Sequence, residues 1–140
     1  MSNVKFTFLT LDSEILAEVV DHARSLYPQE ACGLLIGRGN QATRFLPATN
    51  TLASETAFEM DPAFLASTFR SIRASGEELV AIFHSHPKAP AEPSKRDLER
   101  AFYPEAAHLI VSLARPESPQ IKAFRIIDGA ACEIEVHAIV

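Results

Sequence analysis

Residues 79–97 read LVAIFHSHPKAPAEPSKRD and join an apolar run to a proline-rich connection and a polar helix start. Every residue of Leu79–Phe83 is apolar, which is typical of a central strand covered on both faces. His84 and His86 leave from the end of this strand, two residues apart. Because residues i and i+2 of an extended chain point to the same side, we expect both imidazoles to face one point. The alternative is two unrelated histidines at a strand end, one hydrogen-bonded and one exposed.

The connection after the histidines has three prolines among residues 87–93 and is not expected to form regular structure. Ser94 is expected to cap a helix that continues to about Phe102, with Asp97 on its first turn. A serine followed three residues later by an acidic residue is, by itself, more often a helix cap than a chemical motif. Capping also fixes the carboxylate in position, and the stiff connection can bring Asp97 back to the two imidazoles.

Two imidazole nitrogens and one carboxylate oxygen can hold a zinc ion and leave a fourth tetrahedral position for water, as in hydrolytic sites. His84, His86 and Asp97 are therefore the candidate metal ligands. A hydrolase also needs a proton acceptor near that water, because the departing amine must be protonated. Glu30 is a candidate because it is a charged residue directly before an apolar strand. A solvated glutamate at a strand entry would give the same pattern.

Hydrophobic periodicity and turn residues predict one α/β (α+β) domain over residues 1–140, with a mixed, mostly antiparallel sheet and about three helices packed on it. The other expected strands are Val4–Leu11, Glu30–Gly37, Ala42–Pro47, Leu109–Ala114, Ile121–Ile127 and Cys132–Ile139. Two further helices are expected from Asp12 to a stop at Pro28, and from Asp61 to Gly76. The polar segment 48–59 is a candidate active-site or substrate loop.

The composition excludes several classes of function. The chain has 140 residues and a net charge of −5, so it lacks the clustered positive charge that nucleic acid binding requires. It shows no export signal and no apolar stretch near the roughly 20 residues of a membrane span, which predicts a cytoplasmic protein without a membrane partner. Cys32 and Cys132 have no second cysteine close to either and are expected to be reduced core thiols.

Several short motifs occur together in one order, namely Pro28-x-Glu30-x-Cys32-Gly33-Leu34-Leu35-x-Gly37, His84-Ser85-His86-Pro87, Ser94 and Asp97. In this combination the sequence resembles the JAMM (MPN-plus) metallopeptidases, also called the JAB domain, especially their small bacterial and archaeal members. The resemblance implies a cytidine-deaminase-like fold and one zinc ion (Zn2+) per chain with a bound water, held by His84, His86 and Asp97. It also implies Glu30 as general base and acid, and Ser94 as an oxyanion stabiliser.

The resemblance further implies a peptidase or isopeptidase that cuts after the Gly-Gly tail of a ubiquitin-like (β-grasp) sulfur-carrier protein, its expected partner. An exposed sheet edge could accept such a tail or a second copy of the chain, so monomer and homodimer both stay open. Alternatives are a zinc amidase acting on a small molecule or cell-wall peptide, and a noncatalytic scaffold, for which loss of Glu30 or a ligand is the expected mark. A nucleobase deaminase would show His-x-Glu and Pro-Cys-x-x-Cys, and this chain has neither.

The remaining histidines have no partner at metal-ligand spacing and are expected to be surface or core residues: His22, His108 and His137. Three cationic residues flank the predicted site and could attract a substrate carboxylate or simply be solvated: Lys88, Lys95 and Arg96.

Overall fold

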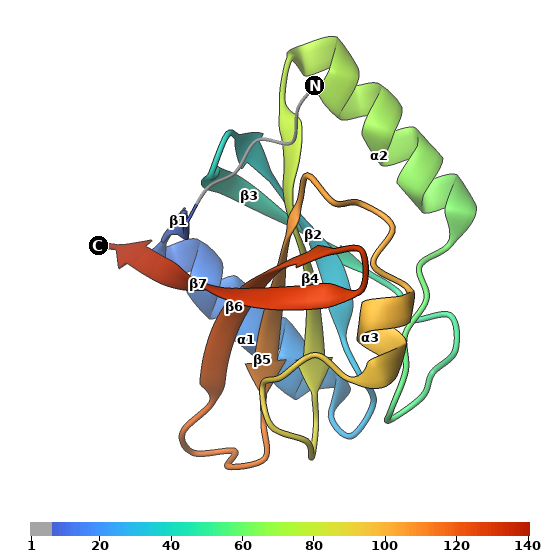
Figure 1. The fold of residues 1–140 in the computed structure, drawn as a ribbon, viewed down its shortest axis with the longest axis vertical. Coiled ribbons are helices and arrows are strands. Elements are labelled where there is room, and N and C mark those ends of the chain that lie inside the picture. Colours follow the sequence, from blue (N-terminus) through green and yellow to red (C-terminus); the bar gives the residue numbers. More distant parts are fainter. Residues whose placement is uncertain (1–6) are drawn as a thin grey trace.

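The strands of the protein close into a barrel in the order β1-β3-β2-β4-β5-β6-β7, and β7 pairs back with β1 (Figure 1). The computed structural model describes residues 7–140, so residues 4–6 of the first predicted strand lie outside the described part. The strands are β1 (Phe8–Asp12), β2 (Cys32–Arg38), β3 (Gln41–Ala48), β4 (Glu78–His86), β5 (Ala107–Ser112), β6 (Gln120–Ile127) and β7 (Ala130–Ile139). The pairs β1·β3, β1·β7 and β4·β5 are parallel, and the others in the described chain are antiparallel. The predicted mixed, mostly antiparallel sheet is confirmed.

Closure gives each described strand a neighbour on both sides, although β1 and β3 join only at Thr10–Gln41 and Leu11–Ala42. Among residues 7–140, therefore, no strand is left unpaired along one whole side, and the expected exposed edge strand is not found. The reason is the parallel pairing of β1 with β7, which joins the two ends of the strand order. Within the same residues, none of the helices combines the length and the apolar character that crossing a bilayer would require.

Successive side chains of each strand point to opposite faces of the sheet, and helices pack on both faces. On β4, Phe83 belongs to the core that includes the buried side of α1 (Ser13–Leu26). Its neighbour Ile82 belongs to the cluster around α2 (Pro62–Ser75). His84 and His86 share the alternation of Ile82, so both rings lie on the α2 side of the sheet.

The third helix, α3 (Lys95–Glu99), lies on this same side. Its Leu98 packs against a cluster that contains Ile110 of β5, and Ile110 is the register partner of His84 across the parallel β4·β5 pair. Figure 1 shows α2 and α3 along one side of the barrel, with α1 lying behind the strands in this view. The two histidines of β4 and the start of α3 therefore lie on the same face of the sheet.

Helix boundaries follow the predicted signals at α2. Asp61 accepts a hydrogen bond from the N–H of Ala63, and Pro62 occupies the first turn, where a missing N–H costs nothing. Gly76 ends the helix with φ of 75°, a left-handed conformation that glycine adopts without a side-chain clash.

Two elements near the site differ in length from the prediction. Strand β4 continues to His86 instead of ending at Phe83, because both neighbouring strands run on beside it, with His86 opposite Ser112 of β5. The histidines are therefore part of the sheet. Helix α3 stops at Glu99 instead of about Phe102, and Phe102, which is 63% exposed, would add little buried apolar surface to a further turn.

Candidate active site

Three side-chain atoms meet at the carboxyl end of β4. His84 Nε2, His86 Nε2 and Asp97 Oδ2 each lie 3.1 Å from the other two. Both histidines are buried, and only a tenth of the Asp97 side chain is exposed. Three ligands of a tetrahedral zinc ion with bonds of about 2.0 Å lie about 3.3 Å apart, so both the donor atoms and their spacing fit zinc. The predicted convergence of these three residues is found.

Each imidazole has a further contact that fixes its orientation. His86 Nδ1 lies 2.8 Å from the carbonyl oxygen of Pro90, which assigns the proton to Nδ1 and turns the Nε2 lone pair toward the shared point. The proline-rich connection therefore supplies the orienting group. His84 stacks on the ring of Phe58 with centroids 4.7 Å apart. Burial lowers the pKa of His84, which favours the neutral imidazole that metal binding needs.

Asp97 is held by a capping box at the start of α3. Its Oδ2 accepts a hydrogen bond from the Ser94 N–H at 2.9 Å, and Ser94 Oγ accepts one from the Asp97 N–H at 3.0 Å. Burial opposes ionisation of Asp97, but its close contacts with His84 and His86 outweigh it and hold the pKa of Asp97 below its usual range. The Asp97 carboxylate therefore caps α3 and contacts both histidines at the same time.

Glu30 reaches the same site because β2 pairs with β4 in a register that sets Cys32 opposite His84. The residue is 4% exposed, and its Oε1 has no hydrogen-bond partner among residues 7–140. Burial raises the pKa of Glu30 to about 7; the charge of His86 opposes this rise and that of Asp97 adds to it. A carboxyl group with a pKa near neutrality can both accept and return a proton.

Backbone contacts on two sides hold Glu30 in place. Ser85, on the face of β4 opposite the histidines, accepts a hydrogen bond at Oγ from the Ala31 N–H at 2.8 Å, and its own N–H donates to the Ala31 carbonyl. Asn50 Nδ2 donates to the Glu30 carbonyl at 3.0 Å, and the Glu30 N–H donates to the Ser54 carbonyl at 2.8 Å. Sequence reasoning missed the roles of Ser85 and Asn50, because only the strand register and the loop path show what they bind.

Asn50 also closes the segment 50–59, called here the 50–59 loop. Its Nδ2 donates to the carbonyl of Ala57 at 2.9 Å, and its Oδ1 accepts from the N–H groups of Leu52 and Glu59 at 3.1 and 3.2 Å. One buried amide thus joins both ends of the loop to each other and to Glu30. The loop brings Phe58 onto the His84 ring, which supports the expectation that this polar segment borders the site.

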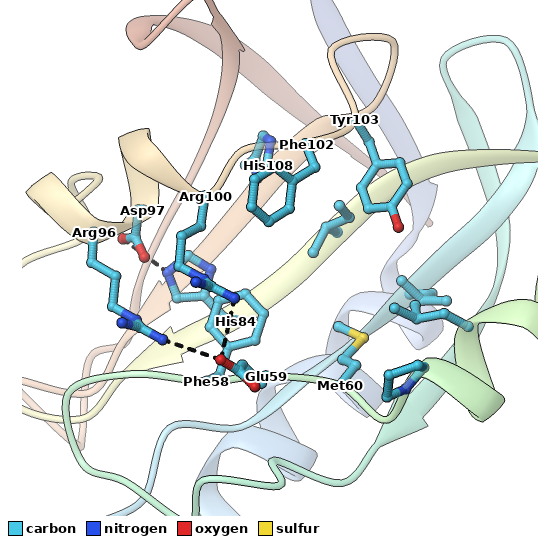
Figure 2. A pocket seen from close by; sticks show the side chains of 14 residues that line it. Phe58, Glu59, Met60, His84, Arg96, Asp97, Arg100, Phe102, Tyr103 and His108 are labelled. Carbon is cyan, nitrogen blue, oxygen red and sulfur yellow. Dashed lines mark hydrogen bonds and ion pairs between the residues drawn. The ribbon is translucent and has the colours of Figure 1, made fainter.

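A cavity of about 250 Å³, called here the side pocket, opens beside two of the candidate ligands. Its lining residues are Leu34, Phe58, Glu59, Met60, Pro62, Leu65, Ile82, His84, Arg96, Asp97, Arg100, Phe102, Tyr103 and His108. Figure 2 shows Arg96 and Arg100 reaching from α3 and its end to the carboxylate of Glu59, close to His84 and Phe58. The pocket is therefore mainly apolar, with its charged groups gathered near the candidate metal site.

The remaining predicted residues fall outside the three-ligand group. His22 Nε2 lies 3.2 Å from the Cys32 carbonyl, and His137 pairs with Glu135 at the surface. His108 is buried and lines the side pocket, and burial lowers its pKa to about 4. Burial also raises the pKa of the Cys32 thiol to about 12, which argues against a thiolate nucleophile. Sequence spacing gave no signal for the position of His108 or Arg100 beside the site.

Comparisons with known proteins agree with this geometry. A family model described as prokaryotic homologues of the JAB domain matches residues 12–127. The CysO-cysteine peptidase of Mycobacterium tuberculosis is 32% identical over 133 residues, which cover 94% of this chain and 91% of that protein. The desampylase of Haloferax volcanii is 33% identical over 111 residues, covering 74% and 80%. A Desulfitobacterium hafniense protein of known solution structure is similar with a TM-score of 0.81 and 39% identity, covering 91% of this chain and 90% of that one.

Proposed function

Since this chain belongs to the family of prokaryotic JAB-domain homologues, we propose that it is a zinc-dependent peptidase with His84, His86 and Asp97 as the metal ligands. The observation that carries the proposal is the meeting of three donor atoms at 3.1 Å beside a buried glutamate. A noncatalytic scaffold of the same fold would be expected to have lost one of these residues, and all of them are present.

When bound, zinc supplies a Lewis acid that polarises a carbonyl group and lowers the pKa of water to about 7. Glu30 has a pKa of about 7, so near neutral pH it takes a proton from the attacking water and returns it to the departing amine. The backbone hydrogen bonds of Glu30 to Ser54 and Asn50 hold the residue at the candidate site during both transfers. No further acid is needed to complete the proton balance.

Ser94 is the candidate second donor to the oxyanion. Its Oγ accepts the N–H of Asp97, so the hydroxyl proton remains available for a hydrogen bond to another group. The residue is exposed and adjoins the connection that carries the Pro90 carbonyl, so a substrate carbonyl can approach it from solvent.

The proposed substrate is a conjugate of a ubiquitin-like sulfur-carrier protein, cleaved after the carrier's glycine-ended tail. The names of two similar proteins support this choice, since one is a CysO-cysteine peptidase and another a desampylase. The chain covers 91% and 80% of their lengths, so it spans most of each relative. A monomer or homodimer working in the cytoplasm remains the expectation from the sequence.

The test is cleavage of a carrier fused to a short C-terminal extension, followed by mass spectrometry at neutral pH with zinc-loaded protein. Glu30→Gln should keep bound zinc, measured by elemental analysis, and lose about 10²- to 10⁴-fold in turnover because the general base is removed. Glu55→Gln is the matched control, because Glu55 is an exposed residue of the 50–59 loop that pairs only with Lys88 among the described groups. Unchanged turnover in Glu30→Gln would remove Glu30 from this role, and an uncut fusion would reject the carrier substrate.

A further inference from the structure

The side pocket adjoins the reacting position, because its wall includes His84 and Asp97. Apart from these and the charged groups near them, the wall is largely apolar, with contributions from Phe58, Met60 and Phe102. Figure 2 shows Phe102 and Tyr103 on the side of the pocket away from Glu59. A cavity of about 250 Å³ is small, close to the lower end of the range for ligand pockets. It suits one amino acid residue better than an extended segment.

The cationic side chains around the site differ in whether each has a carboxylate of its own. Lys88 pairs with Glu55 at 3.2 Å, and Lys95 pairs with Glu99 at 4.0 Å, so each has its own carboxylate. Arg96 and Arg100 instead share the single carboxylate of Glu59, at 3.5 and 3.2 Å. Two guanidinium groups therefore share one carboxylate in this part of the pocket wall, in a chain whose net charge is −5.

Arg100 is placed to bind a further anion. Its guanidinium carbon lies 5.5 Å from the centroid of the Phe102 ring, which limits the positions the group can take. Its side chain is 43% exposed, as is 41% of the Glu59 side chain. An exposed ion pair of this kind contributes little to stability, so a substrate carboxylate can join or displace Glu59 at low cost.

The two sides of the scissile bond differ in what they offer such a pocket. A glycine-ended carrier tail has neither side chain nor charge next to the bond. The leaving side has a side chain, and when it consists of a single residue it also has a free α-carboxylate. We propose that the side pocket binds a single leaving residue with an uncharged side chain, and that Arg100, assisted by Arg96, pairs with its α-carboxylate. This inference rests on the proposed function and narrows its substrate class to conjugates ending in one amino acid.

The experiment compares two substrates that differ by one charge. Both are a carrier whose Gly-Gly tail is followed by methionine, in one case with the free carboxylate and in the other with a C-terminal carboxamide. Wild-type protein should cleave the acid with a kcat/KM about tenfold higher than the amide, the effect of one charge-assisted contact. Arg100→Gln should remove most of that preference, mainly through a higher KM for the acid. Lys95→Gln is the matched control, because it removes one positive charge from the same helix outside the pocket and should keep the preference.

A binding measurement on metal-free protein gives a second readout. L-methionine should shift the NMR signals of the Phe102 and Tyr103 rings in wild-type protein, whereas L-methioninamide should not, and the shift should be lost in Arg100→Gln. Equal kcat/KM for acid and amide, or equal loss of preference in Arg100→Gln and Lys95→Gln, would overturn the pocket assignment while leaving the peptidase proposal standing. Failure to cleave either substrate would reject the carrier substrate, and with it this inference.

Discussion

Replacing Asn50 with alanine should destabilise the fold more than any exposed polar substitution, because one buried side chain makes four hydrogen bonds. It donates to the carbonyls of Glu30 and Ala57 and accepts from the N–H groups of Leu52 and Glu59, at 2.9 to 3.2 Å. A net contribution of about 1 kcal/mol per bond, reduced where water can enter, gives an expected loss of about 3 kcal/mol. Asn50→Asp keeps the acceptor but loses both donors, so it should lower the free energy of unfolding by at least half of that amount.

Urea denaturation of the metal-free protein measures this loss as a change in midpoint at constant slope. Asn40→Ala is the control, because Asn40 makes one exposed hydrogen bond, from Nδ2 to the Phe8 carbonyl, and should change the free energy of unfolding by less than about 1 kcal/mol. Hydrogen exchange at the N–H of Glu30, which binds the Ser54 carbonyl, should become faster in Asn50→Ala. A loss of less than about 1 kcal/mol, or unchanged exchange at Glu30, would refute the idea that Asn50 ties the loop to Glu30.

Two further predictions concern buried titratable groups. Burial raises the folded-state pKa of Glu30 from 4.5 to about 7, so the folded protein binds that proton more tightly than the unfolded chain. Between pH 4 and pH 8 the free energy of unfolding of metal-free wild-type protein should therefore fall by about 3 kcal/mol relative to that of Glu30→Gln. Urea denaturation of both proteins at each pH measures this difference. A difference that stays constant with pH would contradict the reasoning. The Cys32 thiol is buried with its pKa raised to about 12, whereas Cys132 is exposed, so iodoacetamide at pH 8 should label Cys132 alone in mass spectra of the native protein. Equal labelling of the two cysteines would contradict it.

The metal-ligand candidates could be predicted because they depend on local geometry. Alternation along one strand sets His84 and His86 on the same side, and the Ser94 cap fixes Asp97 on the first turn of a helix. The position of Glu30 could not be derived in this way, since it depends on which residue of β2 faces His84 across the sheet. Its charge before an apolar strand made it a candidate, and the family resemblance implied its role.

The parts that sequence reasoning missed all depend on contacts between distant segments. Ser85 alternates away from the histidines, and its partner, the Ala31 N–H, is 54 positions away in the chain. The position of Arg100 at the side pocket depends on α3 ending at Glu99, which places Arg100 at the cap of the helix. Both the partner of Ser85 and the end of α3 are set by tertiary packing, which one-dimensional periodicity does not encode.

The pairing of β1 with β7 has a mechanical consequence. Five residue pairs join the two strands in parallel, from Phe8–Glu135 to Asp12–Ile139. A force that pulls on the two ends of the chain would act along these strands in opposite directions, so it would load all five pairs in shear at once instead of peeling them apart one by one. Resistance to stretching is thereby concentrated where the first and last described strands meet.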